Sequence, residues 1–177
     1  MRKITLAAIA LAGSAALVGV TAVPAFAVTT DDTTATVTVE AGVLSITVPA
    51  TAALSTVLPG ANSTADLGAT KVTDARAGTA NWTATVILPA LTSDVLVGET
   101  IPTTGATYLA GTATLTGEPT VTTPTTVTDL STAAVTSQAT TAVSGNNSAS
   151  WAATLTVPIP DQVLADTYTG VMTQSVS

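Results

Sequence analysis

The chain has 177 residues, of which 11 are acidic and only four are basic, and its formal net charge is −7. It contains neither cysteine nor histidine, which excludes disulfides, most nucleophilic triads and most transition-metal sites. Nucleic acid is excluded as a partner, because phosphate binding needs clustered Lys and Arg. The acidic residues stand mostly singly, and no spaced oxygen-ligand motif for calcium is present. We therefore predict no enzyme, no cofactor and no catalytic, cofactor-binding or metal-binding residues.

Residues 1–27 have the features of a secretory signal peptide. Two basic residues follow the initial methionine, residues 4–23 are apolar and rich in small side chains, and "AFA" at 25–27 fits a signal-peptidase site. A membrane anchor is the alternative, since about 20 apolar residues can span a bilayer. The small residues and the cleavage site favour removal. We therefore predict a secreted mature chain that begins near Val28, contains no membrane span and carries a net charge of −9.

The remaining sequence predicts an all-β domain over residues 28–177. Threonine, valine and other β-branched residues dominate it, and such side chains suit pleated sheet better than helix. Runs that alternate in polarity, separated by Gly, Pro, Asn and Asp, cover residues 34–41, 43–50, 65–75, 81–88, 105–117, 150–157 and 167–176. Seven or more short strands of this kind indicate a single Ig-like, Greek-key β-sandwich.

The connections between these runs differ in length. Residues 40–42 predict a tight hairpin between the first two runs. Residues 89–104 break the alternation, and we expect a loop or a short extra element there. Residues 117–149 are rich in Thr and Ser and are long for a loop. They would contain weak strands around 121–130 and 134–143, or else form an exposed insertion.

The two tryptophans occupy the same local setting. Trp82 lies in "NWTATVILP" and Trp151 in "SWAATLTVP", each at the head of an alternating run with alanine two positions further on. The alternation places both rings on the apolar side of their strands, which favours the core. A second interpretation is that each ring packs one edge into the core and exposes the rest, so that sugar rings can stack on it. On that interpretation the two strands are equivalent, and both rings lie on related edges of the sandwich.

At these residues the chain resembles the WxL family, wall-associated proteins of Gram-positive bacteria. The resemblance covers residues 44–86, with a strand, a long loop, a second strand and Asp-x-Arg before the first Trp, and it covers residues 151–177. Leucine is absent from both triplets, "WTA" at 82–84 and "WAA" at 151–153, as in a divergent, actinobacterial-like member. The resemblance implies a β-sandwich that binds peptidoglycan non-covalently. The residues that it implicates in ligand binding are Trp82, Trp151, Asp74 and Arg76.

Asp74 and Arg76 have two interpretations of their own. Two positions apart at the end of a strand, they can pair with each other. Alternatively, Arg76 is the only arginine of the mature chain and could be kept for an anionic group of a ligand. We expect the Asp–Arg pair.

Two functions from different classes remain open at this point. The first is a secreted protein of the cell wall or cell surface that binds peptidoglycan or another wall glycan through its tryptophans. The second is a structural subunit of a surface fibre or layer, whose partners are other surface proteins and whose copies pair through the edges of their β-strands.

Overall fold

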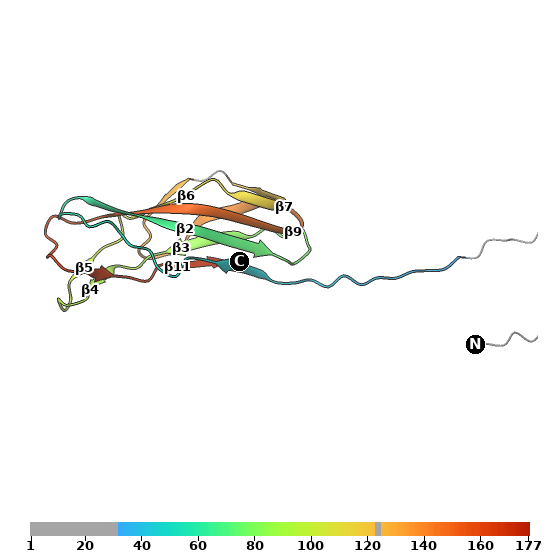
Figure 1. Cartoon of the computed structure of the whole chain (residues 1–177), viewed down its shortest axis with the longest axis horizontal. Coiled ribbons are helices and arrows are strands. Elements are labelled where there is room, and N and C mark those ends of the chain that lie inside the picture. Colours follow the sequence, from blue (N-terminus) through green and yellow to red (C-terminus); the bar gives the residue numbers. More distant parts are fainter. Residues whose placement is uncertain (1–31, 123–124) are drawn as a thin grey trace, which may run out of the picture. The chain divides into compact units, whose positions relative to one another are not determined.

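The computed structural model describes residues 32–122 and 125–177 (Figure 1). The predicted signal peptide, residues 1–27, lies outside the described residues. The chain divides into two units, residues 1–37 and 38–177. In the first unit, the described residues 32–37 are exposed and form no strand. No helix long and apolar enough to cross a membrane occurs in the described part of the chain.

The second unit is the predicted all-β sandwich, and every strand pairing that the structure describes is antiparallel. Its strands are β1 (Leu44–Thr47), β2 (Asn62–Asp74), β3 (Thr83–Ile87), β4 (Leu91–Ser93), β5 (Thr100–Ile101), β6 (Thr107–Ala110), β7 (Thr114–Val121), β8 (Thr126–Thr128), β9 (Val135–Pro158), β10 (Tyr168–Thr169) and β11 (Thr173–Val176).

The alternating sequence of β2 explains its two faces. Side chains along this strand are exposed and buried in turn, and the pattern slips once, between Asp66 and Ala69. Gly68 lies in this bulge with a φ of 69°, a left-handed conformation that glycine adopts without steric cost. The bulge resets the alternation, so that Leu67 within it and Thr70 after it are both buried.

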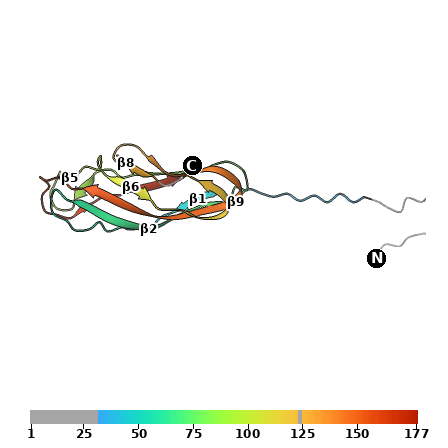
Figure 2. The ribbon, with the colours of Figure 1, turned by 90° about the horizontal axis from the view of Figure 1, so that it is seen from above.

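The 24-residue strand β9 belongs to both layers of the sandwich. Its first part, residues 135–139, pairs with β3, and its last part, residues 147–158, pairs with β2, which is labelled with β9 in Figure 2. Between the two parts lies Gly145, with a φ of 66°. β7 pairs with residues 140–144, between the two parts, and with residues 148–150 of the last part, through two register shifts. One layer therefore contains β1, β2, the last part of β9, β6 and β8, and the other contains β11, β3 and the first part of β9.

The core lies between these layers. At one margin, β1 and β11 approach each other without pairing, so the sandwich is nearly closed. A separate sheet of β10, β4 and β5 lies at one end of the second unit (Figures 1 and 2). The larger core side chains, all fully buried or nearly so, are Leu67, Val72, Trp82, Val86, Leu88, Tyr108, Leu130, Trp151, Leu155 and Val157.

The predicted strand over residues 34–41 and its hairpin are wrong. Residues 33–42 are exposed and pair with no described strand, and the Val37 and Val39 side chains are 85% and 78% exposed. The Gly42 N–H donates to the Ala75 carbonyl oxygen at 2.8 Å instead of closing a turn. Alternation establishes that a segment has the period of a strand, but a strand also needs an edge to pair with.

The two stretches without clear alternation contain short strands. Residues 89–104 include β4 and β5, and residues 117–149 include the end of β7, all of β8 and the first part of β9. Few apolar side chains mark these strands in the sequence, because several of their buried positions hold Thr, Ser or Gln. Gln138 and Thr140, for example, are buried in β9.

Candidate functional site

Trp82 and Trp151 meet in the middle of the core. Trp82 directly precedes β3, and its backbone pairs with Thr140 of β9. Trp151 lies in the last part of β9, opposite Thr70 of β2. The two indole rings stack with centroids 6.5 Å apart and planes inclined by 10°, within the range of favourable aromatic pairs. The tryptophan pair thus joins the two layers of the sandwich.

The expectation that these rings are partly exposed is wrong. Trp82 is 1% exposed and Trp151 is 2% exposed. Trp151 also does not lie at the head of a strand on an edge, because the last part of β9 has β2 on one side and β6 and β7 on the other. Each ring stacks on the other with one face, and other buried side chains of the core surround the pair, so neither ring presents a face to solvent. Sugar cannot stack on either ring in this arrangement.

Both indole N–H groups have a buried acceptor. Trp82 Nε1 donates to Asn147 Oδ1 at 3.2 Å, and Trp151 Nε1 donates to the Tyr108 hydroxyl at 3.0 Å. The Tyr108 hydroxyl in turn donates to Gln174 Oε1 at 3.4 Å. Burial raises the pKa of Tyr108 above its ordinary value. Such partners offset the cost of removing polar groups from water.

Arg76 pairs with Asp74, as expected. Its Nε and Nη2 donate to the two carboxylate oxygens at 2.9 and 3.0 Å, and its backbone N–H donates to Oδ1 at 3.1 Å. The hydrogen bond from the Arg76 guanidinium holds the pKa of Asp74 below its usual value. The Asp74 side chain is 3% exposed and that of Arg76 is 31% exposed. The Arg76 guanidinium therefore covers the Asp74 carboxylate, and the Arg76 side chain itself remains partly exposed to solvent.

The Asp–Arg pair continues inward to the tryptophans. Asn147 Nδ2 donates to Asp74 Oδ2 at 3.5 Å and to the Gly145 carbonyl oxygen at 3.1 Å. Because Asn147 also accepts from Trp82, one amide connects the ion pair to the indole. Arg76 Nη2 additionally lies 3.1 Å from the carbonyl oxygen of Ala80 in the turn before Trp82. All four residues that the resemblance implicated belong to this structural assembly, which we call the tryptophan cluster.

The comparisons with known proteins give no relative. No family model, no curated protein and no solved structure matches this chain. Among residues 32–122 and 125–177, no group of three or more acidic side chains is placed to hold a metal ion.

The outer face of the β2 layer is a surface that the sequence analysis did not single out. The strand registers align side chains from β1, β2, β9, β6, β7 and β8 in rows, all exposed or half-buried. Two rows are Thr47, Lys71, Ser150 and Thr114, and Ser45, Thr73, Ser148 and Thr116. The other two are Asp66, Thr154, Leu109 and Thr126, and Thr64, Thr156, Thr107 and Thr128.

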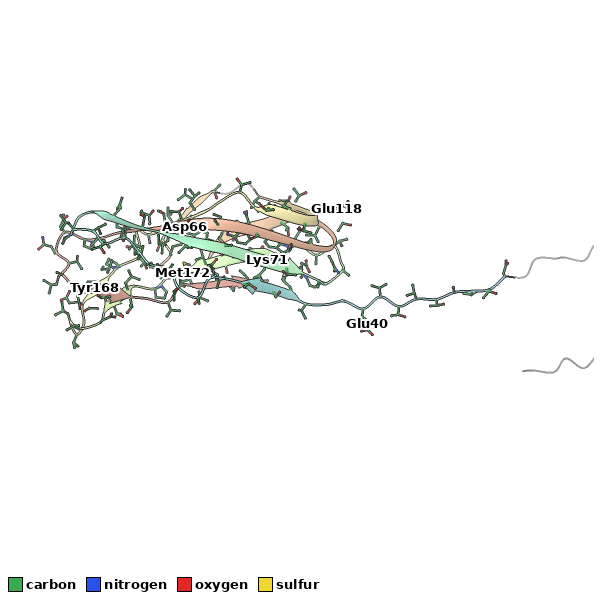
Figure 3. All side chains as sticks on the ribbon, viewed as in Figure 1. Glu40, Asp66, Lys71, Glu118, Tyr168 and Met172 are labelled. Atoms are coloured by element: carbon green, nitrogen blue, oxygen red, sulfur yellow. The ribbon has the colours of Figure 1, made fainter. Side chains whose placement is uncertain are left out.

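We call these sixteen residues the hydroxyl face. Thirteen of them are Ser or Thr, and the two charged ones are Asp66 and Lys71, labelled in Figure 3. The signal for this face was present in the sequence as the polar half of each alternating run. It could not be assembled without the registers, because the rows combine strands that are up to about a hundred residues apart.

Proposed function

We propose that this chain is a secreted protein of the Gram-positive cell surface, whose β-sandwich binds wall glycan such as peptidoglycan without a covalent bond. The hydroxyl face is the observation that carries the proposal. The predicted signal peptide supports export, and the resemblance to WxL proteins supports the location at the wall. The contact surface in this proposal is the hydroxyl face rather than the tryptophans, because both rings are buried.

The chemistry of the hydroxyl face suits a glycan. Each Ser or Thr hydroxyl can both donate and accept a hydrogen bond, as the hydroxyl and acetamido groups of wall sugars do. The face carries one Asp and one Lys and is therefore close to neutral, within a chain of net charge −7. An acidic wall polymer would be repelled by the rest of the protein and least by this face.

The tryptophan cluster has an indirect role in this function. Trp151 is buried beneath the hydroxyl face, between Ser150 and Ala152 on the outer side of β9. Stacking on Trp82 fixes β9 against the opposite layer, and hence fixes the rows that cross it. In this proposal the residues of the tryptophan cluster are positioning residues. They hold the strands of the hydroxyl face in register and make no contact with the sugar.

Sedimentation with purified Gram-positive cell walls tests the proposal. The Thr114→Glu/Thr154→Glu variant puts two carboxylates on the hydroxyl face, at exposed positions that leave the core unchanged. The matched control, Thr136→Glu/Thr173→Glu, adds the same charge at exposed positions of the opposite layer. We expect wild type and control to sediment with the walls and the face variant to bind at least tenfold more weakly. Equal binding of all three folded proteins would refute the proposal.

A further inference from the structure

An apolar groove opens where the margins of the two layers diverge. One wall is residues 48–54, which follow β1, and the other is residues 167–172, which lead to β11. Buried leucines line the groove between these walls, so that it reaches the core: Leu67, Leu88, Leu91 and Leu155. Its volume is about 480 Å³, and none of the described residues that line it is charged. Tyr168 and Met172, labelled in Figure 3, lie on the second wall.

Residues 33–42, which we call the arm, have a pattern that complements this groove. They read "TTATVTVEAG", and no charge occurs before Glu40. Val37 and Val39 alternate with threonines and are 85% and 78% exposed. Exposed valines at every second position are typical of a β-strand. Because this segment pairs with no described strand, it is a strand sequence that lacks a partner.

We propose that the arm of one copy adds as a strand along the open margin of a second copy and places Val37 and Val39 over the groove. Strand addition supplies main-chain hydrogen bonds for affinity, and the pockets for alternate side chains supply specificity. Ten extended residues span about 33 Å, long enough to follow one wall. This proposal is independent of the binding of wall glycan.

Charge favours a second copy as the occupant. Two copies of a chain with net charge −7 repel each other over most of their surfaces. The groove lining and the first seven residues of the arm carry no charge, so they can meet without that repulsion. A basic partner would find no carboxylate in the groove to bind, and an acidic partner would be repelled by the surrounding surface.

The geometry makes the contact head to tail. β1, from which the arm leaves, begins toward the end of the second unit that is opposite the small sheet (Figures 1 and 2). Leu91 of β4 and Tyr168 of β10, both in that small sheet, line the groove. A contact between two different surfaces of identical copies generates a ring if the rotation between copies closes, and an open filament if it does not.

The test separates the two halves of the contact. Val37→Asp/Val39→Asp disables the arm, and Val171→Asp disables the groove at a position that is 78% exposed and therefore outside the core. The control is Val95→Asp/Val97→Asp, at valines that are 75% and 103% exposed and line neither the groove nor the arm. The mass of each protein, expressed from Val28, is measured by light scattering across a range of concentrations.

We expect wild type and control to form a concentration-dependent series of multimers, and each disabled variant to stay monomeric. An equimolar mixture of the two disabled variants should form dimers and nothing larger, because only one arm and one groove remain functional. A synthetic peptide of residues 33–43 should block wild-type assembly. Monomeric wild type at all concentrations would overturn the proposal. Assembly of the arm variant alone or of the groove variant alone would overturn it as well.

Discussion

Asn147 shows at the scale of one residue how a polar amide can stabilise an apolar core. Its carbonyl oxygen accepts from the Trp82 indole, and its NH₂ group donates to Asp74 and to the Gly145 carbonyl oxygen. A buried donor or acceptor left without a partner costs about 1–3 kcal/mol. The amide therefore stabilises the fold by satisfying groups on three different segments.

Asn147→Leu should lower the free energy of unfolding by about 1–3 kcal/mol, because it leaves the Trp82 N–H without an acceptor. Urea denaturation followed by tryptophan fluorescence measures this change. Asn146→Leu is the matched control, since the neighbouring Asn146 is exposed, and a change within about 0.5 kcal/mol is expected for it. Equal effects of the two substitutions would show that the hydrogen bonds of Asn147 contribute little.

Asp74 should make the stability of the protein depend on acid. Its pKa in the folded state lies below the ordinary value of 3.8, chiefly because Arg76 donates to the carboxylate. The ionised carboxylate therefore stabilises the folded state fully above that ordinary value, and this contribution is lost as the pH falls through the lowered native pKa. Wild type should exceed Asp74→Asn in stability at pH 6, and the difference should shrink below about pH 4. A difference that stays constant from pH 6 to pH 2 would contradict this assignment.

At the scale of elements, alternation predicted the strands that have an apolar inner face. The runs at 43–50, 65–75 and 81–88 correspond to β1, β2 and β3. The prediction failed where a strand depends on its partner. Residues 34–41 alternate but have no strand edge to pair with. The strands expected around 134–143 and at 150–157 are parts of the single strand β9. Local pattern carries the period of a segment and says nothing about which distant segment lies beside it.

The same limit applies to the tryptophan cluster. The pairing of Asp74 with Arg76 could be predicted because the two residues are neighbours in sequence and have opposite charge. The stacking of Trp82 on Trp151 could not, because it joins residues from opposite layers across the core. The sequence pattern of each strand alone therefore could not decide whether its tryptophan ring is buried in the core or exposed at the surface.

Stacked indoles give this cluster a spectroscopic signature. Because the two rings lie 6.5 Å apart and nearly parallel, their electronic transitions should couple and produce a paired band in the far-ultraviolet circular dichroism. Trp82→Phe and Trp151→Phe should each abolish that band while the β-sheet signal remains. Trp82→Ala should also destabilise the fold by about 3–5 kcal/mol, as expected for a large side chain removed from a core. Retention of the paired band in either Phe variant would contradict the stacking.

At the scale of the whole molecule, charge limits how this protein could bind the wall in the function that we propose. A chain with four basic residues and a net charge of −7 gains nothing from electrostatic attraction to an acidic wall polymer. The proposed attachment would have to come from hydrogen bonds and apolar contacts, which dissolved salt weakens little. Salt instead screens the repulsion between protein and polymer. At 1 M ionic strength the Debye length is about 3 Å, so charges further apart than this repel each other only weakly.

Binding of the wild-type protein to purified walls should therefore be as strong at 1 M salt as at 50 mM salt, or stronger. The fraction that sediments with the walls across a salt series measures this. The Thr136→Glu/Thr173→Glu variant, with a more negative net charge, should show a larger gain with salt than the wild type. A steady loss of binding as salt rises would indicate attachment through charge and would count against the hydroxyl face.

The position of β9 near the end of the chain also determines when the protein can fold. β2, β3, β6 and β7 all pair with β9, so neither layer can be completed before residues 135–158 are available. Pairings between such distant segments form slowly, since the loops between them must close first. A chain that crosses a membrane in the order of its sequence would thus remain unfolded until nearly all of it had passed. In the secretion that we propose, the late position of residues 135–158 would keep the chain unfolded during its passage.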